Sequence, residues 1–158
     1  MAESDSSSRF TNGPSDGQPP GPPLIGALLR APWEDVQRHM LERLHDRGFA
    51  DFDAAYLPVF RYPGPEGARP SDLAARLRIS KQALNYLLRE LERLDYLERR
   101  PDPDDLRSKR IALTSRGNAA VKVIRDAVAE TEAAWSRRLG PKRFAQLRAL
   151  LHDLNHLG

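Results

Sequence analysis

The feature that most constrains the fold is the segment RRPDPDDLRSKRIALT, residues 99–114. Two runs typical of β-strands, Tyr96–Arg100 and Lys109–Leu113, flank the turn-forming residues PDPDDLRS. The pattern predicts a short hairpin whose tip carries alternating acidic and basic side chains. A hairpin that only completes a hydrophobic core needs no such tip, so the charge indicates a surface that binds a partner.

Two short helices are predicted immediately before this hairpin. The first opens at Pro70, with Asp72 in its first turn, where the helix dipole favours an anion. Arg69, directly before it, is a poor N-cap residue. Ser80 is a good N-cap for the second helix, KQALNYLLRELERLDY. Two short helices joined by so tight a turn predict a helix-turn-helix.

The second of these helices has two faces that do not mix when residues are placed about 100° apart around its axis. The apolar face would anchor the helix to the core and consists of Ala83, Leu84, Leu87, Leu88 and Leu91. The opposite face, with the cap, carries groups suited to base edges and phosphates: Ser80, Lys81, Gln82, Asn85, Tyr86 and Arg89. An ordinary solvated face is the alternative, but such a face mixes charge signs, and acids are absent here until Glu90.

The charge distribution points the same way. Residues 69–116 hold twelve Lys or Arg against eight Asp or Glu, so the whole net charge of +3 lies in this third of the chain. A local basic surplus is typical of a nucleic-acid binder.

Helices are also predicted on both sides of this region. Apolar residues recur at helical spacing from Leu24 to Arg47, where Pro32 is expected to kink or split the run. A further helix is predicted from about Asp53 to Arg61, a long one from the Thr114 cap to Leu139, and a last one after Gly140-Pro141. Residues 1–23, rich in Ser, Gly and Pro, predict a disordered tail. The remainder, 24–158, predicts a single domain with N-terminal helices (24–66), a winged helix-turn-helix (67–116) and C-terminal helices (117–158).

The sequence from Asp105 to Thr114 matches the D-x-R-x-x-x-x-x-L-T wing signature of the MarR (multiple antibiotic resistance regulator) family position by position. The preceding SDLAARLRISKQALNYLLRELERLDYLERRPDPDD is similar to that family's helix-turn-helix, and the resemblance covers roughly Arg69 to Gly117. One departure is Asp95, where many relatives carry Gly. Asp tolerates the left-handed backbone conformation better than most residues.

This resemblance implies a mostly helical fold with a small β-wing, and a function in transcription regulation. Arg107 would enter the DNA minor groove, whose negative potential attracts a guanidinium. Asp105 would orient that guanidinium as a bidentate partner, unless the pair only staples the hairpin. Phosphate contacts are expected from Arg99, Arg100, Lys109 and Arg110.

The resemblance also implies a homodimer formed by the N- and C-terminal helices, which on a duplex predicts a pseudo-palindromic operator. Exposed Leu-rich stripes agree with this, and the expected interface residues are Leu28, Leu29, Phe144, Leu147, Leu151 and Leu154. Relatives commonly bind small aromatic or anionic effectors beside the dimer helices. Residues that could line such a pocket, or simply pack in the core, are Trp33, His39, Met40, Tyr56, Phe60 and Trp135.

Several classes of protein find no support. The chain has no Cys, no phosphate-binding Gly-rich loop and no nucleophile elbow, so neither an enzyme nor a cofactor is expected. His152 and His156 lack a third ligand of suitable spacing, so no metal is expected. No run approaches the ~18 apolar residues of a membrane span, and a cytoplasmic location is expected. The alternative function is a winged helix that binds protein without specific DNA recognition. That alternative predicts apolar residues on the exposed face of residues 81–89, which this sequence lacks.

Overall fold

The computed structural model describes residues 22–61 and 64–156. Residues 1–21 of the predicted tail therefore lie outside the described residues. The elements in chain order are α1 (Ile25–Asp46), the 3₁₀ helix η1 (Ala54–Phe60), α2 (Pro70–Leu77), α3 (Lys81–Arg93), β1 (Leu97–Asp102), β2 (Asp105–Leu113), α4 (Ser115–Leu139) and α5 (Pro141–Asn155). The predicted fold class, mostly α with a two-stranded wing, is confirmed. Within the described ranges, no helix combines the length and apolar character that crossing a lipid bilayer requires.

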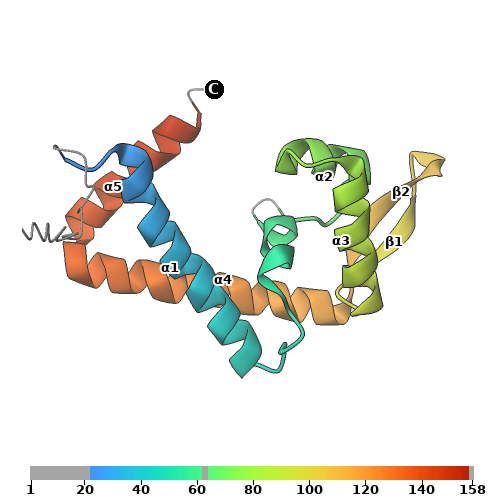
Figure 1. The fold of residues 1–158 in the computed structure, drawn as a ribbon, viewed down its shortest axis with the longest axis horizontal. Coiled ribbons are helices and arrows are strands. Elements are labelled where there is room, and N and C mark those ends of the chain that lie inside the picture. Colours follow the sequence, from blue (N-terminus) through green and yellow to red (C-terminus); the bar gives the residue numbers. More distant parts are fainter. Residues whose placement is uncertain (1–21, 62–63, 157–158) are drawn as a thin grey trace, which may run out of the picture.

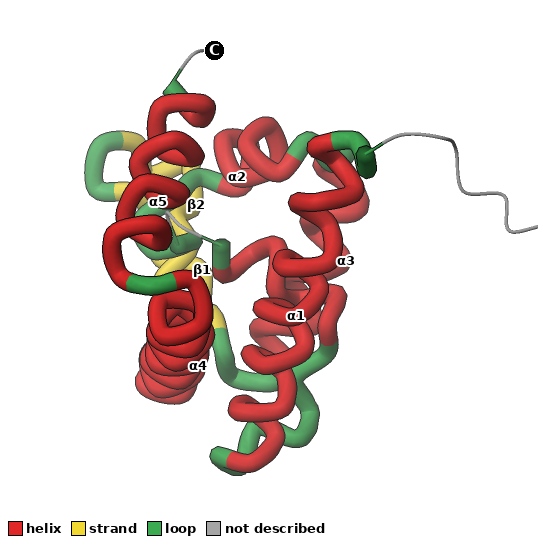
Figure 2. Tube along the Cα trace, turned by 90° about the vertical axis from the view of Figure 1, so that its left-hand side faces the viewer, coloured by secondary structure: helices red, strands yellow, loops and turns green. Residues whose placement is uncertain are grey.

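The helix-turn-helix and the wing lie at one end of the molecule, and α1 and α5 lie at the other (Figure 1). Helix α4 runs between the two ends, in contact with β2 near its start and with α1 and α5 further along. Seen from the side, α4 is viewed nearly along its axis, with α1 next to it and α5 above it (Figure 2). Helix α4 therefore joins the two ends of the described structure.

The hydrophobic core is continuous from α1 through the winged region. Met40 and Leu44 of α1 are buried with Phe52, Leu73 of α2 and Tyr96, which precedes β1. The apolar face predicted for α3 is largely confirmed, since Leu84, Leu88 and Leu91 are buried and Leu87 packs partly against the core. The opposite face of α3 is thereby directed outward.

Three expectations about element boundaries need correction. Helix α1 continues through Pro32, so of the two expected effects, a kink or a split, the split is wrong. The helix expected at 53–61 is a 3₁₀ helix that contains Pro58 and is capped by Asp53, whose carboxylate accepts from the amide of Ala55. The third correction concerns the hairpin: both strands extend into PDPDDLRS, which leaves Pro103 and Asp104 as the turn. Pairing across the hairpin outweighs the local turn preference of these residues.

The predicted caps are confirmed. Ser80 Oγ accepts from the amide of Ala83 at 3.1 Å, and Thr114 Oγ1 accepts from the amide of Gly117 at 3.0 Å. Gly48 and Asp95 both adopt positive φ, at 90° and 60°. Arg69 precedes α2 without a capping side-chain hydrogen bond, as its poor capping propensity predicts.

A polar junction ties the end of the α1 region to the start of α4. The Asp51 carboxylate accepts from the Tyr96 hydroxyl at 2.7 Å and from the Arg116 guanidinium at 2.7 and 2.9 Å. Arg116 also donates to the carbonyl of Leu94 and lies over the Tyr96 ring, 4.5 Å from its centroid. The junction holds the winged region against α1 and α4.

Candidate nucleic-acid interface

Helix α3 presents the polar face that the sequence predicts. Lys81, Gln82, Tyr86 and Arg89 are exposed, and Asn85 is half-buried. Tyr86 is 67% exposed. A helix anchored by leucines on one side and carrying these groups on the other can enter a major groove and donate to base edges.

The strands of the wing lie beside this helix, and the tip of the hairpin extends beyond them (Figure 1). β1 and β2 pair antiparallel from Leu97 with Leu113 to Asp102 with Asp105, with an irregularity at Pro101 and Asp102. Beyond the turn, Leu106 is 80% exposed and Arg107 is also exposed. An arginine at the tip of a narrow ribbon has the shape that a minor groove accepts.

The predicted role of Asp105 requires correction. Its carboxylate accepts from the backbone amide of Arg107 at 3.0 Å and from the hydroxyl of Ser108 at 2.7 Å. These two bonds hold the pKa of Asp105 below its ordinary value. In the described part of the chain, no ion pair joins the Asp105 carboxylate to the Arg107 guanidinium. Asp105 therefore shapes the backbone of the tip and leaves the guanidinium without a carboxylate partner.

Three of the four arginine or lysine side chains expected to contact phosphate are held within the protein. Arg99 forms an ion pair with Glu92 of α3 at 3.1 Å and donates to Asn85 Oδ1 at 3.5 Å. Arg100 donates to Glu98 on the same strand. Arg110 forms an ion pair with Asp102 at 2.9 Å and donates to Asp104 at 2.7 Å. Lys109 is exposed and, among the described residues, has no side-chain partner.

Two residues of this region were not anticipated from the sequence as parts of the site. Asp102 is fully buried, and Arg69 binds it with Nε at 2.6 Å. The signals available were weak. Arg69 was an unfavourable residue before a helix, and Asp102 stood in a stretch that reads as turn-forming.

The six residues suggested for an effector pocket differ in their surroundings. Met40 and Phe60 are buried in the core, and Tyr56 and Trp135 pack against it. Trp33 is 40% exposed and lies under the guanidinium of Arg61, 5.2 Å from it. A cavity of about 510 Å³ lies at the turn between α4 and α5, and one of about 100 Å³ lies between α2 and α3; neither is lined by any of the six. The pocket assignment stays a prediction.

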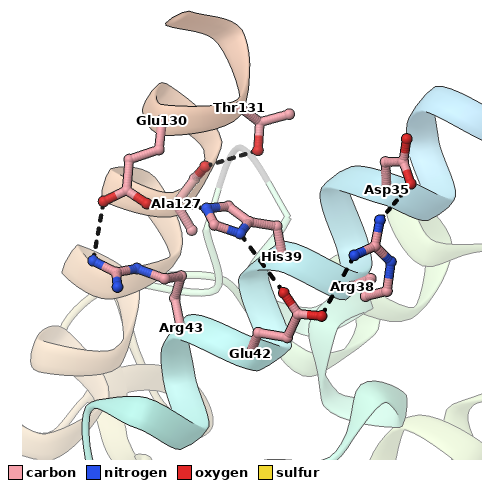
Figure 3. A network of polar contacts seen from close by, with 8 residues as sticks. All are labelled: Asp35, Arg38, His39, Glu42, Arg43, Ala127, Glu130 and Thr131. Atoms are coloured by element: carbon pink, nitrogen blue, oxygen red, sulfur yellow. Dashed lines mark hydrogen bonds and ion pairs between the residues drawn. The ribbon is translucent and has the colours of Figure 1, made fainter. Parts of the chain in front are cut away.

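His39 belongs to a polar network between α1 and α4 (Figure 3). Its Nε2 lies 3.0 Å from Glu130 Oε2, and Arg43 donates to Glu130 Oε1 at 3.1 Å. The hydrogen bond from His39 and the charge of Arg43 lower the pKa of the Glu130 carboxyl. Glu42 and Arg38 extend the network along α1.

Apolar side chains are exposed at the opposite end of the molecule. Leu28 is 52% exposed, Leu29 44%, Leu147 38% and Leu154 58%. Phe144 differs from the other expected interface residues because it is already buried within the chain.

Comparison with known proteins agrees with this architecture. The MarR family profile matches residues 60–108, which span the helix-turn-helix and the wing tip. An HTH-type transcriptional regulator of Bacillus subtilis (strain 168), YkoM, is 29% identical over 128 residues, 81% of each chain.

Two solved structures share the fold. The reduced form of MarR from E. coli superposes with a TM-score of 0.67 at 22% identity, covering 85% of this chain and 98% of that one. A MepR mutant from S. aureus, bound to an oligodeoxyribonucleotide, superposes with a TM-score of 0.53 at 22% identity, with the same coverage. With its helix-turn-helix, its wing and its flanking helices in this arrangement, the chain is similar to the winged helix-turn-helix transcriptional regulators of the MarR family.

Proposed function

We propose that this protein is a sequence-specific DNA-binding regulator whose α3 reads the major groove while the wing enters the adjacent minor groove. The observation that carries the proposal is the pairing of two exposed features: the Lys81–Arg89 face of α3, and the Arg107 guanidinium at the wing tip, free of any carboxylate in the described chain. The DNA-bound MepR structure, which has the same fold, supports this assignment.

In this proposal, each side chain has a defined task. Gln82 and Asn85 suit bidentate contacts to adenine, and Lys81 and Arg89 suit guanine or phosphate. Tyr86 offers its hydroxyl to a phosphate. Ser80, at the start of α3, adds a hydroxyl near the backbone. Lys109 adds a phosphate contact from the wing, as do Arg100 and Arg110 if they exchange their carboxylate partners for phosphate.

The functional form is proposed to be a homodimer of the 24–158 domain. The exposed leucines of α1 and α5 would be covered by a second copy, because a monomer would leave them in water. Two-fold symmetry would place the two copies of α3 about 34 Å apart, on successive turns of one face of a pseudo-palindromic operator.

We also propose that the protein is a repressor that releases DNA when a small aromatic or anionic effector binds. An anionic effector would compete with the Glu130 carboxylate for His39 and Arg43. A ligand that favours one dimer spacing over another would change operator affinity through a population shift. Benzoate is a suitable first probe. A lower affinity for operator in its presence supports the proposal, and an unchanged affinity contradicts it for this ligand.

The alternative function, a winged helix that binds protein, is less well supported. It calls for an apolar exposed face on α3, and Tyr86 is the one large apolar side chain that the structure exposes there among the residues it describes.

The proposal is tested by fluorescence anisotropy with the DNA upstream of the protein's own gene, against a scrambled duplex, across a salt series. Tighter binding to the upstream DNA, with log affinity falling steeply as salt rises, is the expected result. Absence of binding to either duplex at low salt contradicts the proposal.

A further inference from the structure

Asp102 is the one buried charged residue of the described chain, with 0% of its surface exposed. It ends β1, one residue from the turn of the wing. Taking a carboxylate out of water is unfavourable unless charged and hydrogen-bonding partners surround it. Its partners should therefore reveal why a small, solvated hairpin contains such a group.

The partners come from three different places. Arg69, which precedes α2, donates from Nε to Oδ2 at 2.6 Å. Arg110 of the opposite strand forms an ion pair with Oδ1 at 2.9 Å. The amide of Asp104, in the turn, donates to Oδ1 at 3.0 Å. Burial alone would raise the pKa of Asp102, but these contacts outweigh burial and hold its pKa below the ordinary value.

Only one of these contacts leaves the hairpin. Arg110 and Asp104 belong to the wing itself, whereas Arg69 belongs to the helix-turn-helix. The bridge also explains the unfavourable cap, because the side chain of Arg69 serves the wing instead of the first turn of α2.

A second attachment lies at the base of the wing. The amide of Gly67 donates to the carbonyl of Ile111 at 2.8 Å, and the amide of Ile111 donates to the carbonyl of Ala68 at 2.9 Å. These bonds fix one point of β2 against the segment before α2. Arg99 of β1 adds an ion pair with Glu92 of α3 at 3.1 Å, part of the way along the ribbon. The Arg69–Asp102 bridge is the attachment that lies next to the turn, where it defines the direction of the tip.

We propose that Asp102 is a positioning residue that, through Arg69, sets the direction of the wing relative to α3 and so places Arg107 for the minor groove. This inference rests on the proposed DNA-binding function. Asp102 itself is buried and has no direct access to DNA. Its effect on binding must therefore pass through the groups that it holds, and the bridge to Arg69 provides a route to the wing tip.

A double-mutant cycle tests this route. Operator affinity is measured by anisotropy for the wild type, Asp102→Asn, Arg107→Ala and the double variant. We expect Asp102→Asn to weaken binding about tenfold in the wild-type background and less than about twofold in the Arg107→Ala background, since coupled residues are not additive. Equal weakening in both backgrounds overturns the proposal, because a general loss of structure would not depend on Arg107.

Arg69 supplies a second variant in case Asp102→Asn unfolds the protein, which thermal unfolding would reveal. Arg69→Gln removes the bridge but leaves Asp102 with Arg110 and Asp104. The same cycle is expected to show coupling to Arg107, and Arg69→Lys, which keeps the charge, is expected to restore part of the affinity. Loss of affinity that is independent of Arg107 identifies Arg69 as a direct phosphate contact and overturns the bridge.

Hydroxyl-radical footprinting gives a readout that stability alone does not move. Asp102→Asn is expected to lose protection at the minor-groove position of the wing while keeping protection around α3. Retention of both footprints contradicts the proposal. If the wild-type protein leaves no footprint on any operator candidate, the proposed DNA-binding function is wrong. This outcome differs from a wild-type footprint that Asp102→Asn leaves unchanged, which contradicts only the positioning role of Asp102.

Discussion

The backbone amide of Arg107 donates to the carboxylate of Asp105 at 3.0 Å, and the guanidinium of Arg107 takes no part in the contact. A carboxylate that neutralised the guanidinium would have to be displaced before Arg107 could bind DNA. A carboxylate that accepts from the backbone amide leaves the guanidinium available for DNA. It also fixes the position of the Arg107 backbone, from which the side chain extends. The two charged residues of the wing signature thus have different roles. Asp105 holds the backbone at the start of β2, and the guanidinium of Arg107 is available for DNA.

Arg107→Ala is expected to weaken operator binding by about 1–3 kcal/mol, because a minor-groove cation is lost, while secondary structure and association state are unchanged. Anisotropy titration measures the affinity. Arg38→Ala is the matched control, since Arg38 is an exposed arginine of α1 that pairs with Asp35 and Glu42. A similar loss of affinity in both variants would mean that only net charge matters and that the wing assignment is wrong.

Arg99 provides a test of how the wing and α3 cooperate. Because it holds Glu92 and lies 3.5 Å from Asn85 Oδ1, Arg99→Ala is expected to relax base preference at the same operator position as Asn85→Ala. Affinities for a set of single-base operator variants measure this. Arg100→Ala is the control and is expected to lower affinity for all variants by a similar factor. If Arg99→Ala behaves as Arg100→Ala does, Arg99 contacts phosphate, as the sequence alone predicts.

Gly117 is expected to tolerate no side chain. A Cβ at this position would lie 1.9 Å from the carbonyl oxygen of Tyr96 and 3.1 Å from a methyl group of Leu113. Since backbone cannot move away cheaply, Gly117→Ala is expected to lower the free energy of unfolding by about 2–3 kcal/mol or more. Urea denaturation measures the change. Gly26→Ala is the control, because nothing lies within 4 Å of a Cβ there, and Ala in a helix is expected to be neutral or stabilising.

These residues also show how much of the structure can be predicted from the sequence. Caps such as Ser80 and Thr114 and the polar face of α3 follow from local preferences and helical periodicity, so sequence was enough to predict them. The left-handed conformation of Asp95 was expected from the family resemblance, because many relatives carry Gly there. The Arg69–Asp102 bridge joins residues 33 positions apart, and nothing local indicates it. The same is true of Asp51 with Arg116. The strands extend through PDPDD because cross-strand pairing determines their ends, which a reading of single residues cannot show.

The Asp51 junction is expected to make stability depend on pH. Burial raises the pKa of this carboxyl, but the hydrogen bonds from Tyr96 and Arg116 outweigh that and lower it overall. A group with a lowered pKa in the folded state stabilises the protein above its unfolded pKa, near 4, and loses that contribution as the pH falls through the folded value. The difference in unfolding free energy between wild type and Asp51→Asn is therefore expected to be largest near neutral pH and to shrink towards pH 3.

Asp53 supplies the control for that series. Its carboxylate caps η1 through the amide of Ala55, with no arginine beside it in the described contacts. Asp53→Asn keeps an oxygen that can accept this hydrogen bond. Asp53→Asn therefore controls for the replacement of a neighbouring aspartate that has no arginine partner in the described contacts. The difference in unfolding free energy between wild type and Asp51→Asn could instead stay constant from neutral pH to pH 3. That result would show that the ionised form of Asp51 contributes nothing to the junction.

The exposed leucines of α1 and α5 give the last test. Leu28 and Leu154 are 52% and 58% exposed, far from the wing. If a second copy covers them, Leu28→Glu and Leu154→Glu would each bury a charge in an apolar interface, and sedimentation is expected to show a shift towards monomer. Leu106→Glu is the matched control, because Leu106 is 80% exposed at the wing tip and lies outside the predicted interface. It is expected to weaken DNA binding through the wing without changing the association state. A dimer that survives both Leu28→Glu and Leu154→Glu would place the interface on another face, and the spacing of the two α3 helices on an operator would change with it.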